Sequence, residues 1–86
     1  MRVQFHDRDV VAEPHAEALR RWFGVTRTEA TLMIELARGK TPKELADERG
    51  VSMATIRSQL RSIYGKTDTR GQAEVVSLVA RLGALR

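Results

Sequence analysis

The sequence has 86 residues and no cysteine, which excludes disulfides, thiolate zinc sites and cysteine nucleophiles. A domain of this size without disulfides is typical of a reducing compartment, and we expect a cytoplasmic protein. No apolar run approaches the roughly 18 residues that span a membrane, and the N-terminal residues lack the apolar stretch of a signal peptide. We therefore expect no association with a membrane.

Side chains that titrate near neutral pH are also scarce. His6 and His15 are the only histidines, and neither lies beside a nucleophile or at metal-ligand spacing from a second ligand. The sequence has no glycine-rich phosphate loop. We predict that the protein is not an enzyme and that it uses no metal or cofactor. The aromatic pair Trp22 and Phe23 is expected to pack against the core.

Acidic residues are fewer than basic ones, 11 against 15, and the net charge is +4. Residues 1–21 carry four basic and four acidic groups, so the whole excess lies in residues 22–86. The segment 52–67 contains three basic residues and no acidic one. A basic stretch of this kind suits a polyanion. A solvated helix face is equally compatible with the charge taken alone.

Helix start signals predict four helices, over residues 27–38, 42–49, 53–65 and 70–82. Three of these helices begin with a threonine followed three residues later by Glu or Gln, which is the pattern of a capping box. The pairs are Thr26 with Glu29, Thr41 with Glu44, and Thr69 with Gln72. The remaining helix, the third, has Ser52 as its expected N-cap.

Glycine marks the expected end of each helix, because the residue after a helix often adopts a left-handed conformation. These glycines are Gly39, Gly50, Gly65 and Gly83. A shorter helix is expected from Pro14 to Arg21. The pattern as a whole predicts an all-α fold, a four-helix bundle with a short N-terminal extension.

The second and third predicted helices have the spacing of a helix-turn-helix. Ala46 is small, as needed where the two helices approach most closely. Gly50 tolerates the positive φ angle that the turn requires. Ile56 supplies an apolar anchor on the inner face of the second helix of the motif.

The outer face of the helix predicted over 53–65 is polar and basic. Ile56, Leu60 and Ile63 share the inner face, while Ser58, Arg61 and Ser62 lie opposite, flanked by Thr55 and Arg57. Arginine can bond guanine edges in the major groove of double-stranded DNA, and small hydroxyl residues allow close approach. Phosphates can bind near helix N-termini. The residues expected to hold them are Thr41, Lys43, Ser52 and Thr55.

The helix predicted over 70–82 has apolar residues on two faces, one with Val75, Leu78, Val79 and Leu82, the other with Ala73, Val76 and Ala80. A helix on a small monomer buries a narrower stripe. We therefore expect a homodimer through this helix, with an interface drawn from Val75, Val76, Leu78, Val79 and Leu82. The sequence leaves open which face meets the partner, and contact with another domain of a longer chain is the alternative.

Several short motifs between Val25 and Leu82 occur together. They are Thr26-x-x-Glu29, Lys43-Glu44-Leu45-Ala46, Gly50-Val51-Ser52, Thr55-Ile56-Arg57, Ile63 with Lys66, and Ala73-Glu74. With these motifs the chain resembles the LuxR-type (FixJ- or GerE-like) helix-turn-helix domain of bacterial transcription regulators. The resemblance implies four helices, of which the third reads the major groove and the fourth commonly mediates dimers.

The resemblance also assigns roles by motif. Arg57, Ser58 and Arg61 match base-reading positions, and Lys43, Thr55 and Lys66 match positions that contact the DNA backbone. Double-stranded DNA is therefore the expected partner, together with a second copy of the chain. For a transcription regulator, RNA polymerase is a further candidate partner.

Two alternatives stay open. Residues 1–24 fit an N-terminal extension or linker before a DNA-binding domain over 25–86, and they also fit a remnant of an upstream sensory domain. The function has an alternative too, a helix-turn-helix module that acts through protein–protein contacts, as in sigma factors. The target sequence, the signal and the direction of regulation do not follow from the fold class.

Overall fold

The computed structural model describes residues 16–84, which form five helices and no strand. The helices are α2 (Ala16–Phe23), α3 (Arg27–Ala37), α4 (Pro42–Arg49), α5 (Met53–Thr67) and α6 (Gln72–Ala84). The all-α class is confirmed, and α2 occupies most of the short helix expected from Pro14 to Arg21. The expectations for His6 and His15 lie outside the described residues.

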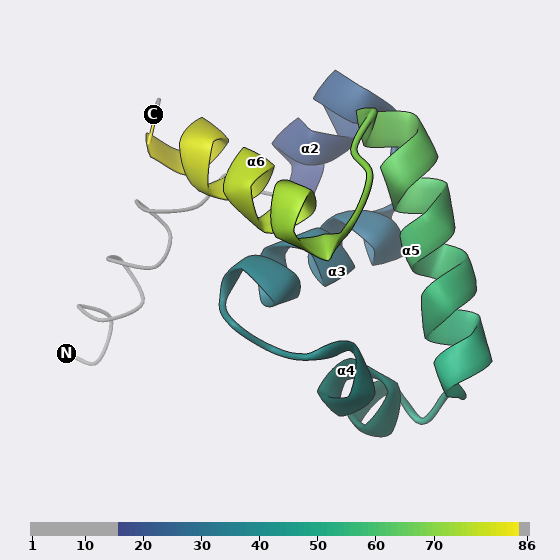
Figure 1. Cartoon of the computed structure of the whole chain (residues 1–86). Coiled ribbons are helices and arrows are strands. Elements are labelled where there is room, and N and C mark those ends of the chain that lie inside the picture. Colours follow the sequence, from purple (N-terminus) through teal and green to yellow (C-terminus); the bar gives the residue numbers. More distant parts are fainter. Residues whose placement is uncertain (1–15, 85–86) are drawn as a thin grey trace, which may run out of the picture.

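Helix α3 lies at the centre of the bundle and packs against α2, α5 and α6 (Figure 1). Helix α4 packs mainly against α5, at the end of the molecule away from α2. Helix α5 therefore touches α3, α4 and α6 along one side. Its other side faces away from the bundle (Figure 1).

One apolar core receives side chains from all five helices. Helices of 8 to 15 residues are marginal alone, so packing rather than propensity holds them in place. Leu19 of α2 is fully buried in the same core as the residues of the other helices. The largest fully buried side chains are Leu19, Leu32, Met33, Leu36, Leu45, Ile56, Ile63, Val75 and Val79.

Two of the three predicted capping boxes are confirmed. At the start of α3, the Glu29 backbone N–H donates to the Thr26 hydroxyl over 3.0 Å, and the Thr26 N–H donates to the Glu29 carboxylate over 2.9 Å. Thr41 and Glu44 form the same pair of bonds at the start of α4. The Ser52 hydroxyl caps α5 by accepting from the Thr55 N–H over 3.1 Å.

The capping box predicted at Thr69 is wrong. Helix α6 begins later, at Gln72, and the Arg70 N–H donates to the Glu74 carboxylate over 2.9 Å. Thr69 is instead used to end α5, because its N–H donates to the Tyr64 carbonyl over 3.0 Å. Its hydroxyl shares a hydrogen bond with that of Thr67 over 2.9 Å.

Glycine ends α3 and α4 as predicted but does not end α5 or α6. Helix α5 continues through Gly65, since Thr67 is buried and its hydroxyl donates to the Ile63 carbonyl over 2.8 Å. The chain leaves α5 at Asp68, which takes the left-handed conformation with φ 57°. Gly83 lies inside α6, so the end predicted there is also wrong.

The prediction for the aromatic pair is half right. Phe23 packs partly buried against the core, on the same face of α2 as Ala16 and Leu19. Trp22 is 52% exposed. On a helix of 3.6 residues per turn, Trp22 falls to the side of that inner face and so remains in solvent.

Candidate nucleic-acid interface

The turn between α4 and α5 has the geometry that the sequence predicts for a helix-turn-helix. Gly50 has a φ of 67°, and its N–H donates to the Asp47 carbonyl over 3.3 Å. The Val51 N–H donates to the Ala46 carbonyl over 3.0 Å, which completes a Schellman motif at the end of α4. A side chain at position 50 would strain this backbone, so glycine sets the angle at which α5 departs.

Ala46 and Ile56 are the buried residues that let the two helices pack against each other. Ala46 is almost fully buried, and Ile56 has no exposed surface. The small side chain lets α4 approach α5, and the larger one holds α5 on the core. The helix-turn-helix inferred from these spacings is therefore confirmed as local structure.

The outer face of α5 presents two arginines. Arg57, Ser58 and Arg61 are all exposed. Within residues 16–84, neither arginine forms an ion pair. Both guanidinium groups are thus available to an anionic ligand.

The sequence placed Ser62 on that outer face, but in the structure it does not lie there. It is half-buried, and its side chain hydrogen-bonds to Glu29 of α3. Ser62 therefore faces Glu29 in the first turn of α3. The exposed polar surface of α5 is therefore narrower than predicted and centres on Ser58 and the two arginines.

The residues predicted to hold phosphate at helix starts are exposed. Thr41, Ser52 and Thr55 each take part in a capping bond, and the Ser52 and Thr55 hydroxyls are also bonded to each other over 3.2 Å. Lys43 is 78% exposed, and its ammonium lies 3.8 Å from the Asp47 carboxylate. A long ion pair between exposed side chains contributes little, so Lys43 remains accessible to a phosphate.

Lys66, predicted to contact the DNA backbone, forms an ion pair with Glu29. Its Nζ atom lies 2.9 Å from Oε1 of Glu29, which is only 7% exposed. Burial alone would raise the pKa of Glu29, but hydrogen bonds from Ser62, Lys66 and the Thr26 backbone, with the charge of Lys66, lower it from 4.5 to about 2. The ion pair leaves two ammonium protons of Lys66 free, and the side chain is 37% exposed.

Two more ion pairs tie α4 to the C-terminal part of α3 and the loop after it. Lys40 and Glu48 are 2.8 Å apart, and Arg49 and Glu35 are 3.6 Å apart. Both helices of the helix-turn-helix are thus attached to α3 by charged groups. Sequence reasoning missed these positioning residues, because the partners come from different elements and no local pattern joins them.

The residues predicted for a dimer interface divide between the core and the surface of α6. Val75 and Val79 are fully buried within the monomer, so their assignment to an interface is wrong. Val76 and Leu82 are partly buried against the same core. The outward face instead carries Ala73, Ser77 and Ala80, all exposed.

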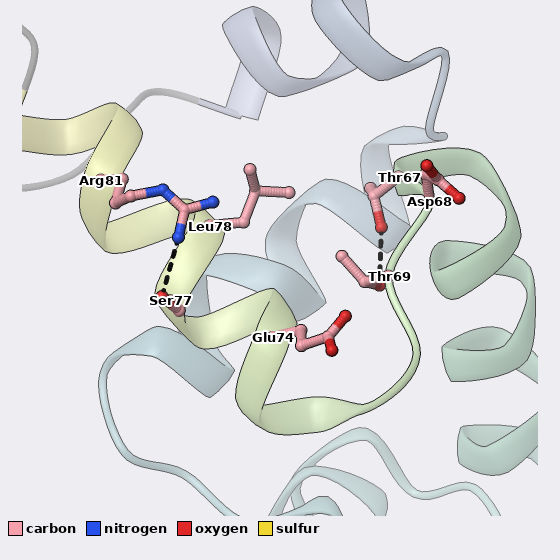
Figure 2. Close-up of a pocket in the computed structure, with 7 residues that line it drawn as sticks. All are labelled: Thr67, Asp68, Thr69, Glu74, Ser77, Leu78 and Arg81. Atoms are coloured by element: carbon pink, nitrogen blue, oxygen red, sulfur yellow. Dashed lines mark hydrogen bonds between the residues drawn. The ribbon is translucent and has the colours of Figure 1, made fainter.

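A hollow of about 270 Å³ lies beside this outward face of α6 (Figure 2). Leu78, Glu74 and Arg81 line it from α6, and the loop after α5 supplies Asp68 and Thr69. The Arg81 guanidinium donates to the Ser77 hydroxyl over 3.0 Å. Of the predicted interface residues, Leu78 is the one that lines this hollow. No helix within the described part of the chain is long and apolar enough to cross a membrane.

Comparison with known proteins also indicates a helix-turn-helix domain. Residues 24–79 match the family described as bacterial regulatory proteins, luxR family. The chain belongs to the LuxR family. The matched range runs from before α3 into α6 and so contains the whole helix-turn-helix. No solved structure matches the chain significantly.

A curated relative of this LuxR-family chain is the transcriptional regulatory protein YdfI of Bacillus subtilis strain 168. The two are 33% identical over 61 residues, which is 71% of this chain. The aligned part covers 29% of the length of YdfI, so the chain spans under a third of this relative. The resemblance inferred from the sequence motifs is confirmed, and the chain carries the DNA-binding helix-turn-helix domain of regulatory proteins of this family.

Proposed function

We propose that the protein binds specific sequences of double-stranded DNA as a transcription regulator, with α5 in the major groove. The observation that carries this proposal is the pair of exposed arginines on α5, Arg57 and Arg61, which have no anionic partner among the described residues. Bidentate bonds from arginine to guanine O6 and N7 are the commonest specific contact in the major groove. Ser58 between them is small enough to let the helix approach the bases.

The DNA backbone is held by residues around the recognition surface. Thr41 and Lys43 lie at the start of α4, and Ser52 and Thr55 at the start of α5. Helix N-termini present free backbone N–H groups and a positive partial charge, both of which suit phosphate. Lys66 supports this surface through its ion pair with Glu29 and offers its remaining protons to a phosphate.

The protein binds its site as a dimer through the outward face of α6. Ala73, Ser77 and Ala80 are small, so two such helices can approach closely. Glu74 and Arg81 lie two turns apart along one flank of this face. In an antiparallel pair whose two-fold axis passes between Ser77 and Leu78, each Glu74 meets the partner's Arg81, and symmetry supplies the contact twice.

Replacing the arginines tests base reading. Arg61→Ala and Arg57→Ala should each weaken binding to the preferred duplex by about 1–3 kcal/mol and relax the preference at one base pair. Arg21→Ala is the matched control, because it removes the same charge from an exposed position on α2. Equal loss on every duplex would assign the arginines to phosphate, and no loss would favour the protein-interaction alternative.

Charge reversal tests the dimer. Glu74→Arg and Arg81→Glu each place like charges opposite one another in a homodimer, so each variant alone should dimerise poorly on DNA. A mixture of the two should recover, because both contacts in the heterodimer again join opposite charges. Glu74→Arg loses the Glu74 cap at the start of α6, whereas Arg81→Glu keeps it. Mixing restores no cap to the Glu74→Arg chain, so recovery reports the contact between copies. A mixture as weak as either variant would contradict this arrangement.

A further inference from the structure

A second hollow, of about 260 Å³, runs along the exposed side of α5. It is lined by Arg57, Leu60, Arg61 and Tyr64. Leu60 is only 6% exposed and Tyr64 is half-buried, so apolar surface lies between the two arginines. The two arginines that border this apolar surface have no ion pair with any described residue. Such a surface suits a ligand that is itself partly apolar and partly anionic.

The Tyr64 hydroxyl has no hydrogen bond to another residue in the range 16–84. Burial raises the pKa of Tyr64 above its ordinary value of 10.0. The phenol is therefore protonated at neutral pH and can donate a hydrogen bond without carrying charge. A polar group that lines a hollow and lacks a partner among residues 16–84 is suited to an external acceptor.

Helix geometry places Tyr64 on the same side of α5 as the two arginines. Arg57, Arg61 and Tyr64 are spaced by four and three residues, so they lie on one side of α5. Tyr64 lies seven residues, or about 10 Å, beyond Arg57 along the helix axis. A recognition helix contacts base edges with its N-terminal residues, so with Arg57 over the base edges Tyr64 lies beyond them, towards the sugar–phosphate backbone.

We propose that Tyr64 is a further DNA contact, whose ring packs on a deoxyribose and whose hydroxyl donates to a phosphate oxygen. This inference rests on the proposed function, because it requires α5 to lie in the major groove. Apolar sugar carbons match the ring and Leu60, and a phosphate oxygen supplies the acceptor that the hydroxyl lacks among the described residues. The contact adds affinity without reading sequence.

The Tyr64→Phe variant tests this contact, because it removes the hydroxyl and keeps the ring. Binding is measured by fluorescence anisotropy on the duplex that the wild-type protein prefers and on an unrelated duplex. We expect affinity to fall about 10-fold on both duplexes, as for a hydrogen bond to a charged group. The slope of affinity against salt should not change, because a neutral donor releases no counterion. Trp22→Phe, at an exposed aromatic residue on α2, should bind like the wild type.

The outcomes separate this inference from the proposed function. Wild-type affinity for Tyr64→Phe, in a protein that still discriminates between the duplexes, would overturn the Tyr64 contact alone. A loss confined to one base pair would also overturn it, since the hollow would then receive a base, for instance a thymine methyl group. A wild-type protein that does not distinguish the two duplexes would overturn both proposals. Urea denaturation of Tyr64→Phe should match the wild type, because its hydroxyl has no partner among the described residues.

Discussion

The buried carboxylate of Glu29 should supply a large part of the stability at neutral pH. Its pKa falls from 4.5 to about 2 in the folded protein. Each pKa unit of difference between the folded and unfolded states equals about 1.4 kcal/mol, so the ionised group contributes about 3 kcal/mol to the free energy of unfolding. Domains of this kind have total stabilities of about 5–15 kcal/mol. We therefore expect Glu29→Gln to cost about 3 kcal/mol at pH 7.

The pH dependence gives this prediction its sign. Because the pKa of Glu29 is lower in the folded state, its contribution is complete above pH 4.5 and is lost as the pH falls through about 2. The contribution of Glu29 is measured by urea denaturation of the wild type and of Glu29→Gln at a series of pH values. The difference in unfolding free energy between the two proteins should be largest near neutrality and should shrink towards zero near pH 2.

Glu44→Gln is the matched control. Glu44 occupies the same position in the capping box of α4, but it is exposed and bonds to the Thr41 N–H over 2.8 Å. Its replacement should cost less than about 1 kcal/mol. A Glu29→Gln loss that stays constant with pH would refute the reasoning, because it would trace the effect to shape rather than to charge. A loss no larger than that of Glu44→Gln would do the same.

Three further predictions concern other parts of the chain. Asp68→Gly should raise the free energy of unfolding by about 1 kcal/mol, since a side chain is strained at φ 57°. If urea denaturation showed a lower free energy of unfolding instead, Asp68 would have to make a stabilising contact. Leu45→Ala should cost about 2–5 kcal/mol, because Leu45 is fully buried, and a thermal midpoint equal to that of the wild type would contradict its place in the core. Lys43→Ala should keep the stability and reduce the slope of log affinity for DNA against log salt by about 0.9; an unchanged slope would remove Lys43 from the phosphate contacts.

Features encoded within a few residues could be predicted from the sequence. The capping boxes of Thr26 and Thr41 need only a partner three residues away, and both form. The left-handed turn at Gly50 depends on one residue type, and the helix-turn-helix follows from it with Ala46 and Ile56. The inward faces of α3 and α5 likewise follow from the helical period.

Features decided by packing could not be predicted in the same way. The ion pair of Glu29 and Lys66 joins residues 37 positions apart, and no local pattern marks them as partners. On α6, apolar residues occupy two faces, and only contact with α3 decides that Val75 and Val79 are buried. Thr69 has a suitable sequence for a helix cap, but its N–H bonds to the Tyr64 carbonyl at the end of α5 instead.

Selection from a pool of random duplex DNA at moderate salt, followed by sequencing of the bound fraction, tests the central claim most directly. A dimeric reader with α5 in the major groove should enrich an inverted repeat whose half-sites lie about one helical turn apart. Enrichment of no sequence, with weak binding that disappears as salt rises, would contradict specific DNA recognition by this surface.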